Sequence, residues 1–373
     1  MNFVRKGSSS TGLTTTVGSN HQGPGYWASR SLAYVIFIAW TLLTLTPLVW
    51  MSYSSFKTNA ELTQNIFSMP NELVFKSDHE YQISDFPSLQ SIADGIPRIT
   101  LESTRIRSFR HFIPVSQLPS EISSLPNGAT LTVNDLPGLL RTRILWRTFF
   151  YNYISAWERG TLGPKFINSL IYVVVSTTAI ILFSMMASYG FAKMQFARAS
   201  KILSTMIALG YLLSIPAIII PLFIMLSNLR LTDTHLGIIL VYVAFGLPLG
   251  VLLGQGYMRG IPDSIVESAH MDGAGHWRVF GSIILPMTVP VIITVSIINA
   301  LGIWNEFLLV LVMASSESTK SLPVGVFSFA SQTSIELGWQ LAALVIAVIP
   351  TMTVYFFFNK RITQGVVAGA VKG

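Results

Sequence analysis

The sequence FINSLIYVVVSTTAIILFSMMASYGF occupies Phe166–Phe191 and contains no charged side chain. A helix needs about 20 mostly apolar residues to cross roughly 30 Å of hydrocarbon, so this stretch is long enough to span a bilayer. The whole chain has a matching composition, since 51% of its 373 residues are hydrophobic and only 11% are charged. Typical soluble domains have about 25% charged residues. The sequence therefore predicts a membrane protein.

Five further stretches have the same character. They are Leu32–Tyr53, Ile202–Leu226, Leu236–Leu253, Leu285–Met313 and Leu337–Phe358. The six stretches contain no Lys or Arg, and Glu306 is their only acidic residue. The stretch at 236–253 is short and the one at 285–313 is long, which predicts a tilt or a break. The many small residues at 168–190 predict close helix packing. We expect an all-α, polytopic protein with six transmembrane helices.

The first apolar stretch predicts an uncleaved anchor, because it is too long for the core of a signal peptide and no small-residue cleavage site follows it. Lys and Arg in short loops favour the cytoplasmic side. If the N-terminus is inside, eleven cations lie in the inside segments, Lys193 among them, and only Arg230 and Lys320 lie outside. We therefore expect both termini on the cytoplasmic side of the membrane.

These observations predict the organisation of the chain. The expected segments are a disordered cytoplasmic tail (1–30), an anchor helix (31–53), an extracytoplasmic loop (54–165) with a small folded insert (71–151), a helical core (166–359) with a cytoplasmic loop (258–286), and a cytoplasmic C-terminal tail (360–373). The alternating stretch ATLTVND at 129–135 predicts some strand in the insert.

Several classes of function are excluded by what the sequence lacks. There is no Cys, and the sequence contains neither a Gly-x-Ser-x-Gly nor a His-Glu-x-x-His motif, so we expect no enzyme active site. The absence of a Gly-Lys dipeptide excludes a Walker A loop. The net charge of +7 comes largely from cations at the ends of apolar runs, which argues against nucleic-acid binding. His270 and His276 do not share a helical face, so we predict no metal site.

The loop at 258–286 predicts a short helix followed by a bend. Pro262 suits a first helical turn, and Asp263 favours the positive end of the helix dipole. Ile265, Val266 and Ala269 form one apolar stripe at helical spacing. Two interpretations stay open from the residues alone. The stripe docks in a cleft on a cytoplasmic partner, or the helix rests in lipid headgroups.

The end of this helix is also predicted from the residues. Gly273 and Gly275 end it and allow a left-handed turn. A second short helix, residues 277–284, then leads into Pro286 and the next apolar stretch.

This loop resembles the EAA loop of binding-protein-dependent ABC importer permeases. The pattern of that loop is Glu-Ala-Ala, three residues, Gly, nine residues, then Ile-x-Leu-Pro. The spacing is kept at Glu267, Ser268, Ala269, Gly273, Ile283, Leu285 and Pro286. Ser268 replaces one Ala of the pattern, which is a small change.

Other stretches resemble the carbohydrate-type branch of this family, similar to the maltose permease G subunit. They are SFKTNAEL (55–62), FINSLI (166–171), WNEFLLVL (304–311), SLPVGV (321–326) and GVVAGAVKG (365–373). The resemblance covers roughly residues 31–70 and 150–373. The larger insert is reminiscent of α-glucoside permeases.

The resemblance implies a type I permease with a five-helix core that forms an alternating-access pathway for an oligosaccharide or glucoside. It also implies a second, homologous permease subunit as a heterodimer partner, two ATPase subunits that hold ATP and Mg, and an extracytoplasmic solute-binding protein. The loop would be the coupling helix, with Asp272 beside Glu267, Ala269 and Gly273 at the ATPase contact. The insert could contact the binding protein or the other permease, or only stabilise the outer face.

Trp304, Asn305 and Glu306 are candidates for the pathway, because an acid within a span is costly and aromatic and amide groups suit sugars. The alternative is that Glu306 caps or pairs with a neighbouring helix. Other functions also stay open: an importer permease for a polyol or another small solute, an ion-coupled secondary transporter, or a membrane-embedded structural protein.

Overall fold

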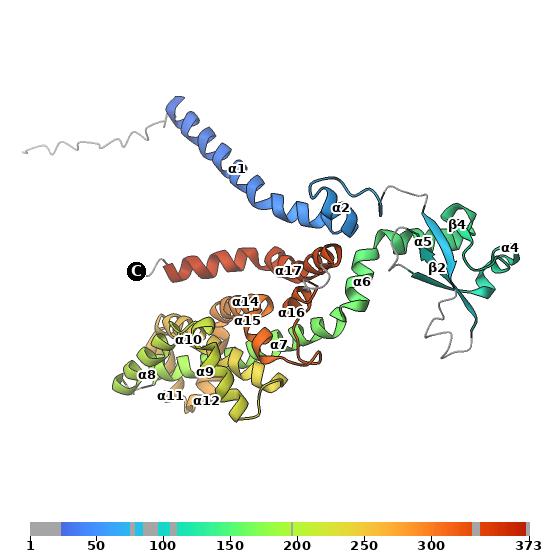
Figure 1. Ribbon diagram of the computed structural model, residues 1–373. Coiled ribbons are helices and arrows are strands. Elements are labelled where there is room, and N and C mark those ends of the chain that lie inside the picture. The colour runs from blue at the N-terminus through green and yellow to red at the C-terminus, as the bar shows by residue number, and fades with distance from the viewer. Residues whose placement is uncertain are drawn as a thin grey trace, which may run out of the picture. The chain divides into compact units, whose positions relative to one another are not determined.

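The computed structural model describes residues 24–74, 79–84, 96–104, 110–194, 197–329 and 336–370 (Figure 1). Contacts within the chain divide it into two compact units, residues 1–50 and 51–373. The first unit contains most of helix α1 (Pro24–Ser54). Large apolar side chains from Leu32 to Val49 are exposed along it, as expected of a helix that faces lipid.

The two ends of the chain differ from the predicted boundaries. Helix α1 begins at Pro24, so the prediction of a disordered tail is wrong for residues 24–30, while residues 1–23 lie outside the described residues. Pro is favourable in a first helical turn, and residues 26–32 contain no helix breaker, so the helix extends before the apolar stretch. At the other end, the backbone of α17 (Leu337–Ala370) stays helical past the predicted boundary at residue 360.

The insert folds around a small antiparallel sheet. Its strands are β1 (Glu80–Ser84), β2 (Arg98–Ser103), β3 (Arg110–Pro114) and β4 (Thr130–Thr132), in the order β3-β2-β1-β4. Strand β1 lies between β2 and β4, and Tyr81 pairs with Ser103 on one side and with Leu131 on the other. Of the stretch 129–135, residues 130–132 form the predicted strand and residues 133–135 form a 3-10 helix. A sheet of four strands means that the all-α description fails for the insert.

One face of the sheet is apolar and packs against helix α5 (Gly138–Phe149). The buried side chains of the sheet alternate along the strands and meet those of α5. The strands and the turn after β4 contribute Tyr81, Ile83, Leu101, Ile113, Leu131 and Val133, and α5 contributes Leu140 and Ile144. The Tyr81 and Thr148 hydroxyls are 3.0 Å apart. The other helices of this region are α2 (Asn59–Gln64), η1 (Val115–Gln117), α4 (Ser120–Ser123), η2 (Val133–Asp135) and α6 (Tyr151–Arg159).

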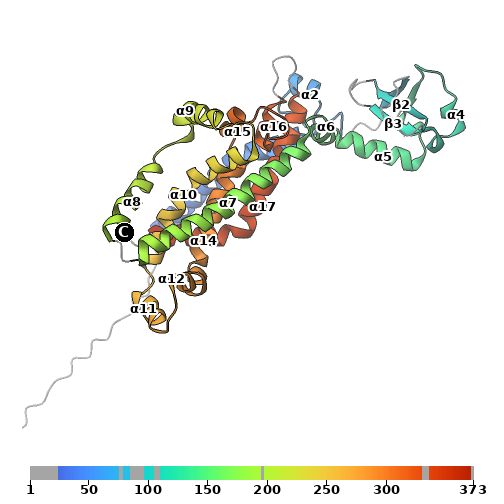
Figure 2. The same ribbon diagram turned by 90° about the horizontal axis from the view of Figure 1, so that it is seen from below.

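The remainder of the second unit is a helical bundle, seen along its side in Figure 2. Its long helices are α7 (Leu162–Lys193), α10 (His235–Arg259), α14 (Val289–Asn305) and α17. They lie side by side, and α7 and α10 have the most extensive contact. With a rise of 1.5 Å per residue, the 32 residues of α7 span about 48 Å.

A glycine seam explains the close contact of α7 and α10. It consists of Gly246, Gly250 and Gly254, which recur every four residues on α10 and face α7. A Cβ on these glycines would lie 2.3 Å from Ile180 Cδ1, 2.7 Å from Ser184 Cβ and 2.5 Å from Ser188 Oγ, respectively. The small residues predicted to allow close packing therefore do so within this chain.

Two of the predicted spans are bent. Four helices are long and apolar enough to cross a membrane, or six if each bent pair counts as one span, within the described residues. The helices α8 (Ala197–Gly210) and α9 (Ile215–Asn228) meet at 100°. Ser214, the N-cap of α9, is extended, and Pro216 in the first turn has no N–H with which to continue the preceding helix, so the predicted span at 202–226 breaks just before Ile215.

The second bend, of 74°, separates the segment His276–Met287 from α14. Before the bend lie α11 (Asp263–Met271), α12 (His276–Val279), a π-helical turn (Phe280–Ile284) and α13 (Leu285–Met287). After α14 the chain breaks again, before α15 (Leu308–Met313) and α16 (Leu322–Phe327). The predicted break within 285–313 is therefore confirmed.

We name the two ends of the bundle after what lies at each end of α7. The end at Leu162, which follows α6 and the insert, is the insert end. The end at Lys193, which contacts the loop between α10 and α14, is the loop end.

Candidate functional site

Helix α11 presents one face to the bundle and the other to solvent. Val266 and Ala269 are buried, with Ile265 packed beside them, in a core that includes Val279 and Ile284. The apolar stripe predicted from the spacing exists, but it attaches α11 to its own bundle. The interpretation in which this stripe faces a partner is therefore corrected, because its side chains are already buried within the chain.

The end of α11 is a Schellman motif. The backbone N–H of Ala274 donates to the Ala269 carbonyl at 2.9 Å, and that of Gly273 donates to the His270 carbonyl at 3.0 Å. Gly273 has a φ of +80°, a conformation that side chains with a Cβ disfavour. The predicted left-handed turn is thus confirmed at Gly273, whereas Gly275 has an ordinary φ of −72°.

A buried lysine fixes the start of α11 to the bundle. The Lys193 ammonium, at the end of α7, lies 2.6 Å from the Asp263 carboxylate and also donates to the carbonyl of Ile261. Sequence analysis counted Lys193 only as an indicator of orientation. It also predicted Asp263 as a partner of the helix dipole, and the structure adds an ion pair between two segments far apart in the sequence.

The outer face of α11 and the turn that follows it is exposed. Glu267, Ser268, Asp272 and Gly273 lie on it, together with two large apolar side chains: Met271 is 88% exposed and Trp277, the second residue of α12, is 74% exposed. The sequence-based analysis missed these two apolar side chains. The spacing could have indicated the first, since Met271 is four residues after Glu267 and shares its helical face.

The last part of the EAA pattern forms the bend rather than a contact surface. Ile283 and Leu285 are partly buried, and Pro286 is exposed. The buried hydroxyl of Thr288 donates to the Leu285 carbonyl at 2.9 Å, where the chain turns into α14. These residues set the angle between the loop and the bundle.

The two histidines of the loop are in contact across the glycine turn. The rings of His270 and His276 are 4.8 Å apart, edge to face, and His270 Nδ1 is 2.8 Å from the Ala274 carbonyl. Within the described ranges, His, Asp and Glu side chains nowhere form the group of three or more that a metal site needs. The histidine pair therefore stabilises the turn.

The candidate acid Glu306 is occupied by structural contacts. Its Oε1 accepts a hydrogen bond from the backbone N–H of Leu309 at 2.8 Å, which caps the first turn of α15. Its Oε2 accepts one from the Tyr242 hydroxyl of α10 at 3.1 Å. The alternative in which Glu306 caps or pairs with a neighbouring helix is therefore the one that the structure supports.

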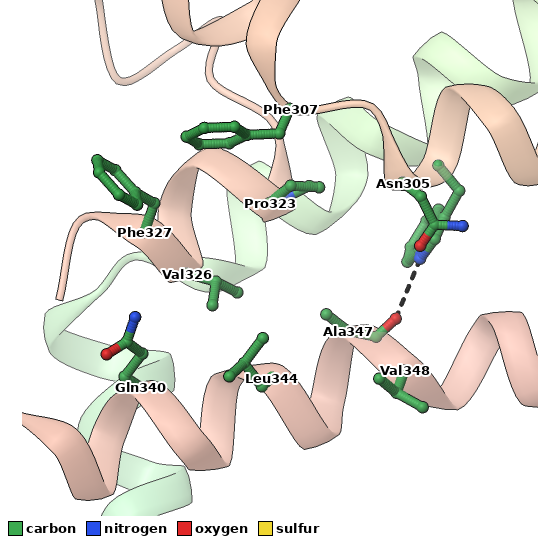
Figure 3. Close-up of a pocket in the computed structure, with 10 residues that line it drawn as sticks. Asn305, Phe307, Pro323, Val326, Phe327, Gln340, Leu344, Ala347 and Val348 are labelled. Atoms are coloured by element: carbon green, nitrogen blue, oxygen red, sulfur yellow. Dashed lines mark hydrogen bonds between the residues drawn. The ribbon is translucent and has the colours of Figure 1, made fainter. Parts of the chain in front are cut away.

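Trp304 likewise has a structural position. It is buried, its ring meets Phe166 edge to face at 5.4 Å, and its Nε1 donates to the Ala347 carbonyl of α17 at 3.1 Å, the dashed line in Figure 3. Asn305 is exposed. Of the three pathway candidates, Asn305 is thus the one whose side chain faces outward.

A cavity of about 320 Å³ lies beside the break between α14 and α15. Residues of α14, α16, α17 and the break itself line it. They are Trp304, Asn305, Phe307, Pro323, Val326, Phe327, Gln340, Leu344, Ala347 and Val348. Figure 3 shows the rings of Phe307 and Phe327 near each other, with the amides of Asn305 and Gln340 at separate positions of the wall. The lining combines aromatic faces with a few amides, as in sites for small polar molecules.

The insert end has its own buried lysine, which sequence analysis also missed. The Lys165 ammonium lies 2.7 Å from the Glu317 carboxylate and donates to the Gly160 carbonyl and the Thr161 hydroxyl. Glu317 also pairs with Lys320, and the hydrogen bonds from both lysines lower the pKa of the Glu317 carboxyl.

The same loop, residues 314–321, is held at further points. The Tyr172 hydroxyl donates to the Thr319 carbonyl at 2.6 Å, and the Asn168 amide donates to the carbonyls of Ser318 and Lys320. Hydrogen bonds lower the pKa of the Asp233 carboxyl, and the one from the Thr319 hydroxyl contributes most. The loop is therefore fixed to α7 by several independent contacts.

Comparison with known proteins places this architecture in a family. The family described as binding-protein-dependent transport system inner membrane component matches residues 180–367, which include the loop at 258–286. The chain is 28% identical over 344 residues to the diacetylchitobiose uptake system permease protein NgcG of Streptomyces coelicolor, covering 92% of this chain and 89% of that protein.

Two further comparisons agree with this match. The chain is 32% identical over 230 residues to the melibiose/raffinose/stachyose import permease protein MelC of Bacillus subtilis, covering 60% of this chain and 81% of that protein. A crystal structure of a bacterial ABC transporter involved in the import of the acidic polysaccharide alginate has the same fold, with a TM-score of 0.61 over 91% of this chain and 98% of that chain at 17% identity.

The family match covers half of the chain and contains both the exposed loop and the helices that carry it. The chain therefore belongs to the family of inner-membrane components of binding-protein-dependent transport systems.

Proposed function

We propose that this chain is the permease subunit of an ATP-binding-cassette importer for a carbohydrate, and that it couples to a separate ATPase through the exposed face of α11. The main support for the proposal is the way in which this helix is attached to the bundle. Val266 and Ala269 bury one face in the bundle, Lys193 fixes its start, and the other face is free of the bundle. A helix mounted in this way moves with the bundle when a partner pushes on it.

The contact surface proposed for the ATPase combines the EAA positions with two apolar side chains. Glu267, Asp272 and Gly273 contribute the polar part, while Met271 and Trp277 contribute exposed apolar area. A partner that covers this face would bury both apolar side chains, which favours association. Ala269, Ile283, Leu285 and Pro286 act indirectly, by holding α11 and setting the bend after it.

We place the loop end in the cytoplasm and the insert end outside. The excess of Lys and Arg in the short segments at the loop end and in the two terminal tails supports this orientation. Residues 54–165 are then extracytoplasmic, and each bent pair, α8–α9 and α12–α14, counts as one span of a protein with six. The five-helix core follows the anchor α1.

The proposed assembly contains two permease subunits, two ATPase subunits and a solute-binding protein. ATP and Mg bind the ATPases, since this sequence has no Walker A loop, and the second permease is a homologue rather than a copy. Closure of the ATPases around ATP moves the two coupling helices together and opens the pathway to the other side, as in alternating access.

We propose an uncharged oligosaccharide as the solute. The six apolar stretches contain no Lys or Arg to attract an anion. NgcG, whose name gives diacetylchitobiose, aligns over 92% of the chain, which necessarily includes most of the insert. MelC, whose name gives melibiose, raffinose and stachyose, aligns over 60% of it.

The cavity beside α14 is the proposed place where this chain contacts the solute. Asn305 and Gln340 offer amides for sugar hydroxyls, and Phe307 and Phe327 offer apolar faces. Trp304 and Glu306 shape the cavity from behind, through their bonds to Ala347 and Leu309.

The test is co-purification of the detergent-solubilised chain with the ATPase and permease encoded alongside it, followed by solute-stimulated ATP hydrolysis. The variants are Glu267→Lys and Met271→Asp on the exposed face of α11. Glu121→Lys, an exposed acid in the insert, is the matched control because it makes the same charge change far from the loop.

We expect wild type and Glu121→Lys to retain the ATPase. The α11 variants should lose it, or keep it with stimulated hydrolysis reduced about tenfold, which corresponds to a loss of roughly 1.4 kcal/mol. If the α11 variants behave like wild type, or if no ATPase associates, the proposed coupling fails.

The solute is tested in the same preparation with diacetylchitobiose, raffinose and glycerol, each presented with the binding protein. We expect the strongest stimulation from an oligosaccharide, and a selective reduction of it in Gln340→Ala. Strongest stimulation by glycerol would show a polyol importer instead.

A further inference from the structure

Five aromatic side chains contact one another at the insert end: Phe56, Trp146, Phe149, Phe150 and Tyr153. Trp157 lies one helical turn after Tyr153 on α6, and the six residues are called the aromatic band below. Trp146 stacks on Phe150 at 5.3 Å with ring planes 7° apart, and Phe56 lies 4.8 Å from Phe149. Most of the band therefore forms one continuous aromatic surface that joins α5, α6 and the chain just after α1.

The band lies where two apolar stretches end. Phe56 follows two residues after the end of α1 at Ser54, and the Tyr153 hydroxyl is 2.6 Å from that of Ser55. Trp157 covers the first turn of α7, since a Cβ on Gly163 would lie 3.3 Å from its ring. The apolar stretch of α1 therefore ends, and that of α7 begins, next to the band.

The outer surface of α7 continues from Trp157 as an exposed apolar ridge. Ile167, Leu170 and Val174 lie four, seven and eleven residues after Gly163, on the same helical face, and all are exposed. A surface of this kind is stable against hydrocarbon. The aromatic band thus forms the outer end of a surface suited to lipid.

The two tryptophans of the band are exposed, Trp146 by 60% and Trp157 by 46%, and its other four rings are half-buried. Helix α5 carries Arg141, Arg143 and Arg147 on its exposed surface and contains no acidic residue, and Arg147 pairs with Glu158 of α6 at 3.9 Å. The charge on α5 suits a negatively charged surface, and Trp and Tyr are enriched where membranes meet water.

We propose that the aromatic band is seated in the phospholipid headgroup layer at the insert end, with Arg143 toward the lipid phosphates. The insert is then anchored to the membrane surface through the end of α5 and through α6. Tryptophan and tyrosine rings lie at the headgroup level, with their apolar bodies toward the hydrocarbon and their polar groups hydrated. The inference rests on the proposed membrane-crossing role and is independent of which solute is carried.

The test uses the fact that the chain contains no cysteine. A single introduced cysteine can carry a nitroxide spin label at one defined place. Ile154→Cys on α6 is next to the band, Leu139→Cys on α5 is the aqueous reference, and Val174→Cys on α7 is the hydrocarbon reference. Leu139 is 90% exposed and lies at the start of α5, about 10 Å along the helix axis from Trp146 and on the side away from α6.

The full-length chain, assembled with its permease and ATPase partners, is placed in nanodiscs of phosphatidylethanolamine and phosphatidylglycerol. Collision of each label with oxygen, which concentrates in hydrocarbon, is compared with collision with a water-soluble nickel chelate. We expect the label at 154 to lose most of the nickel collisions seen at 139 and to show oxygen collisions between those at 139 and 174.

A second measurement tests whether the band itself causes this depth. Trp146→Ser with Trp157→Ser, in the Ile154→Cys background, should raise nickel collisions to the level at 139. ATP hydrolysis in the same nanodiscs reports separately on importer function and on folding.

Three outcomes would overturn the proposal. A label at 154 that is as accessible to nickel as the label at 139 would place the band in water. Protection from both oxygen and nickel would show that a protein covers it. An unchanged depth after both tryptophans are replaced would show that other contacts hold the segment.

Discussion

Each end of α7 carries a buried lysine, and the two lysines are used differently. Lys193 at the loop end binds one carboxylate, that of Asp263, and one backbone carbonyl. Lys165 at the insert end binds the Glu317 carboxylate, the Gly160 carbonyl and the Thr161 hydroxyl, and Glu317 is shared with Lys320. The loop end is thus held by few polar contacts and the insert end by many.

This difference indicates at which end of the bundle a partner can act. At the insert end, the loop at 314–321 has contacts to Asn168, Tyr172 and Asp233 in addition to Lys165. At the loop end, α11 depends on its buried stripe and on Lys193, and its other face is exposed. We therefore expect changes at the insert end to affect mainly stability, and changes at the loop end to affect mainly coupling.

The largest loss of stability is expected from Lys165→Met. The variant loses three polar contacts and leaves the Gly160 carbonyl buried without its ammonium donor, so the free energy of unfolding should fall by about 3 kcal/mol. Thermal unfolding of wild type and variant in the same detergent measures this loss of stability. Lys320→Met, which removes the more exposed partner of Glu317, is the control and should cost under about 1 kcal/mol. Equal losses would contradict the central role of Lys165.

Lys193→Met should cost less stability, about 2 kcal/mol, because it removes two polar contacts and the freed Asp263 carboxylate is exposed to water. Its effect on coupling should be greater. At a temperature where both variants are folded, solute-stimulated ATP hydrolysis should fall further in Lys193→Met than in Lys165→Met. The reverse order would remove the distinction between the two ends.

Gly273→Ala should destabilise the loop end by about 1 kcal/mol, because alanine at a φ of +80° is strained. Gly275→Ala is the matched control, since its φ is −72° and nothing lies within 4 Å of an added Cβ at either position. Thermal unfolding and stimulated ATP hydrolysis are measured for both. Equal behaviour of the two variants would show that the Schellman motif contributes nothing at this site.

The smallest effect is expected from pH at the insert end. Hydrogen bonds from Lys165 and Lys320 lower the pKa of Glu317 from its ordinary value of 4.5. A carboxyl with a lowered pKa stabilises the fold above its ordinary pKa, and that stabilisation is lost as pH falls through the lowered value. Glu317→Gln should therefore be less stable than wild type at pH 7, and the gap should narrow below about pH 4.5. A gap that stays constant to pH 3 would contradict it.

Much of the fold is predictable from the sequence because lipid imposes a simple rule. Apolar stretches of sufficient length, such as 166–191, become helices whatever their neighbours are. A tilt or a break within 285–313 is also predictable, from the length of that stretch, and the strand at 130–132 is predictable from alternation. The bend between α8 and α9 was not predicted, although Ser214 and Pro216 mark it locally.

The short helix and the left-handed turn of the loop at 258–286 were predicted, but the exposed face of that helix was not. Spacing identifies the apolar stripe of α11, but a stripe that faces a partner has the same spacing as one that faces its own bundle. Val266 and Ala269 face the bundle, and Met271 was missed for the same reason. The partners of Lys165 and Lys193 could not be predicted, because Glu317 and Asp263 are far from them in sequence. The glycine seam of α10 was not predicted, although its glycines recur every four residues in the sequence.

The glycine seam has a mechanical consequence for the whole transport cycle. Because Gly246, Gly250 and Gly254 admit no side chain between α7 and α10, the two helices form a single lever, with Lys193 near one tip and Lys165 near the other. A tilt of about 10° over a length of about 48 Å would move the far tip by roughly 8 Å. In the proposed transport cycle, a movement of α11 at the loop end would therefore be carried along both helices to the insert end.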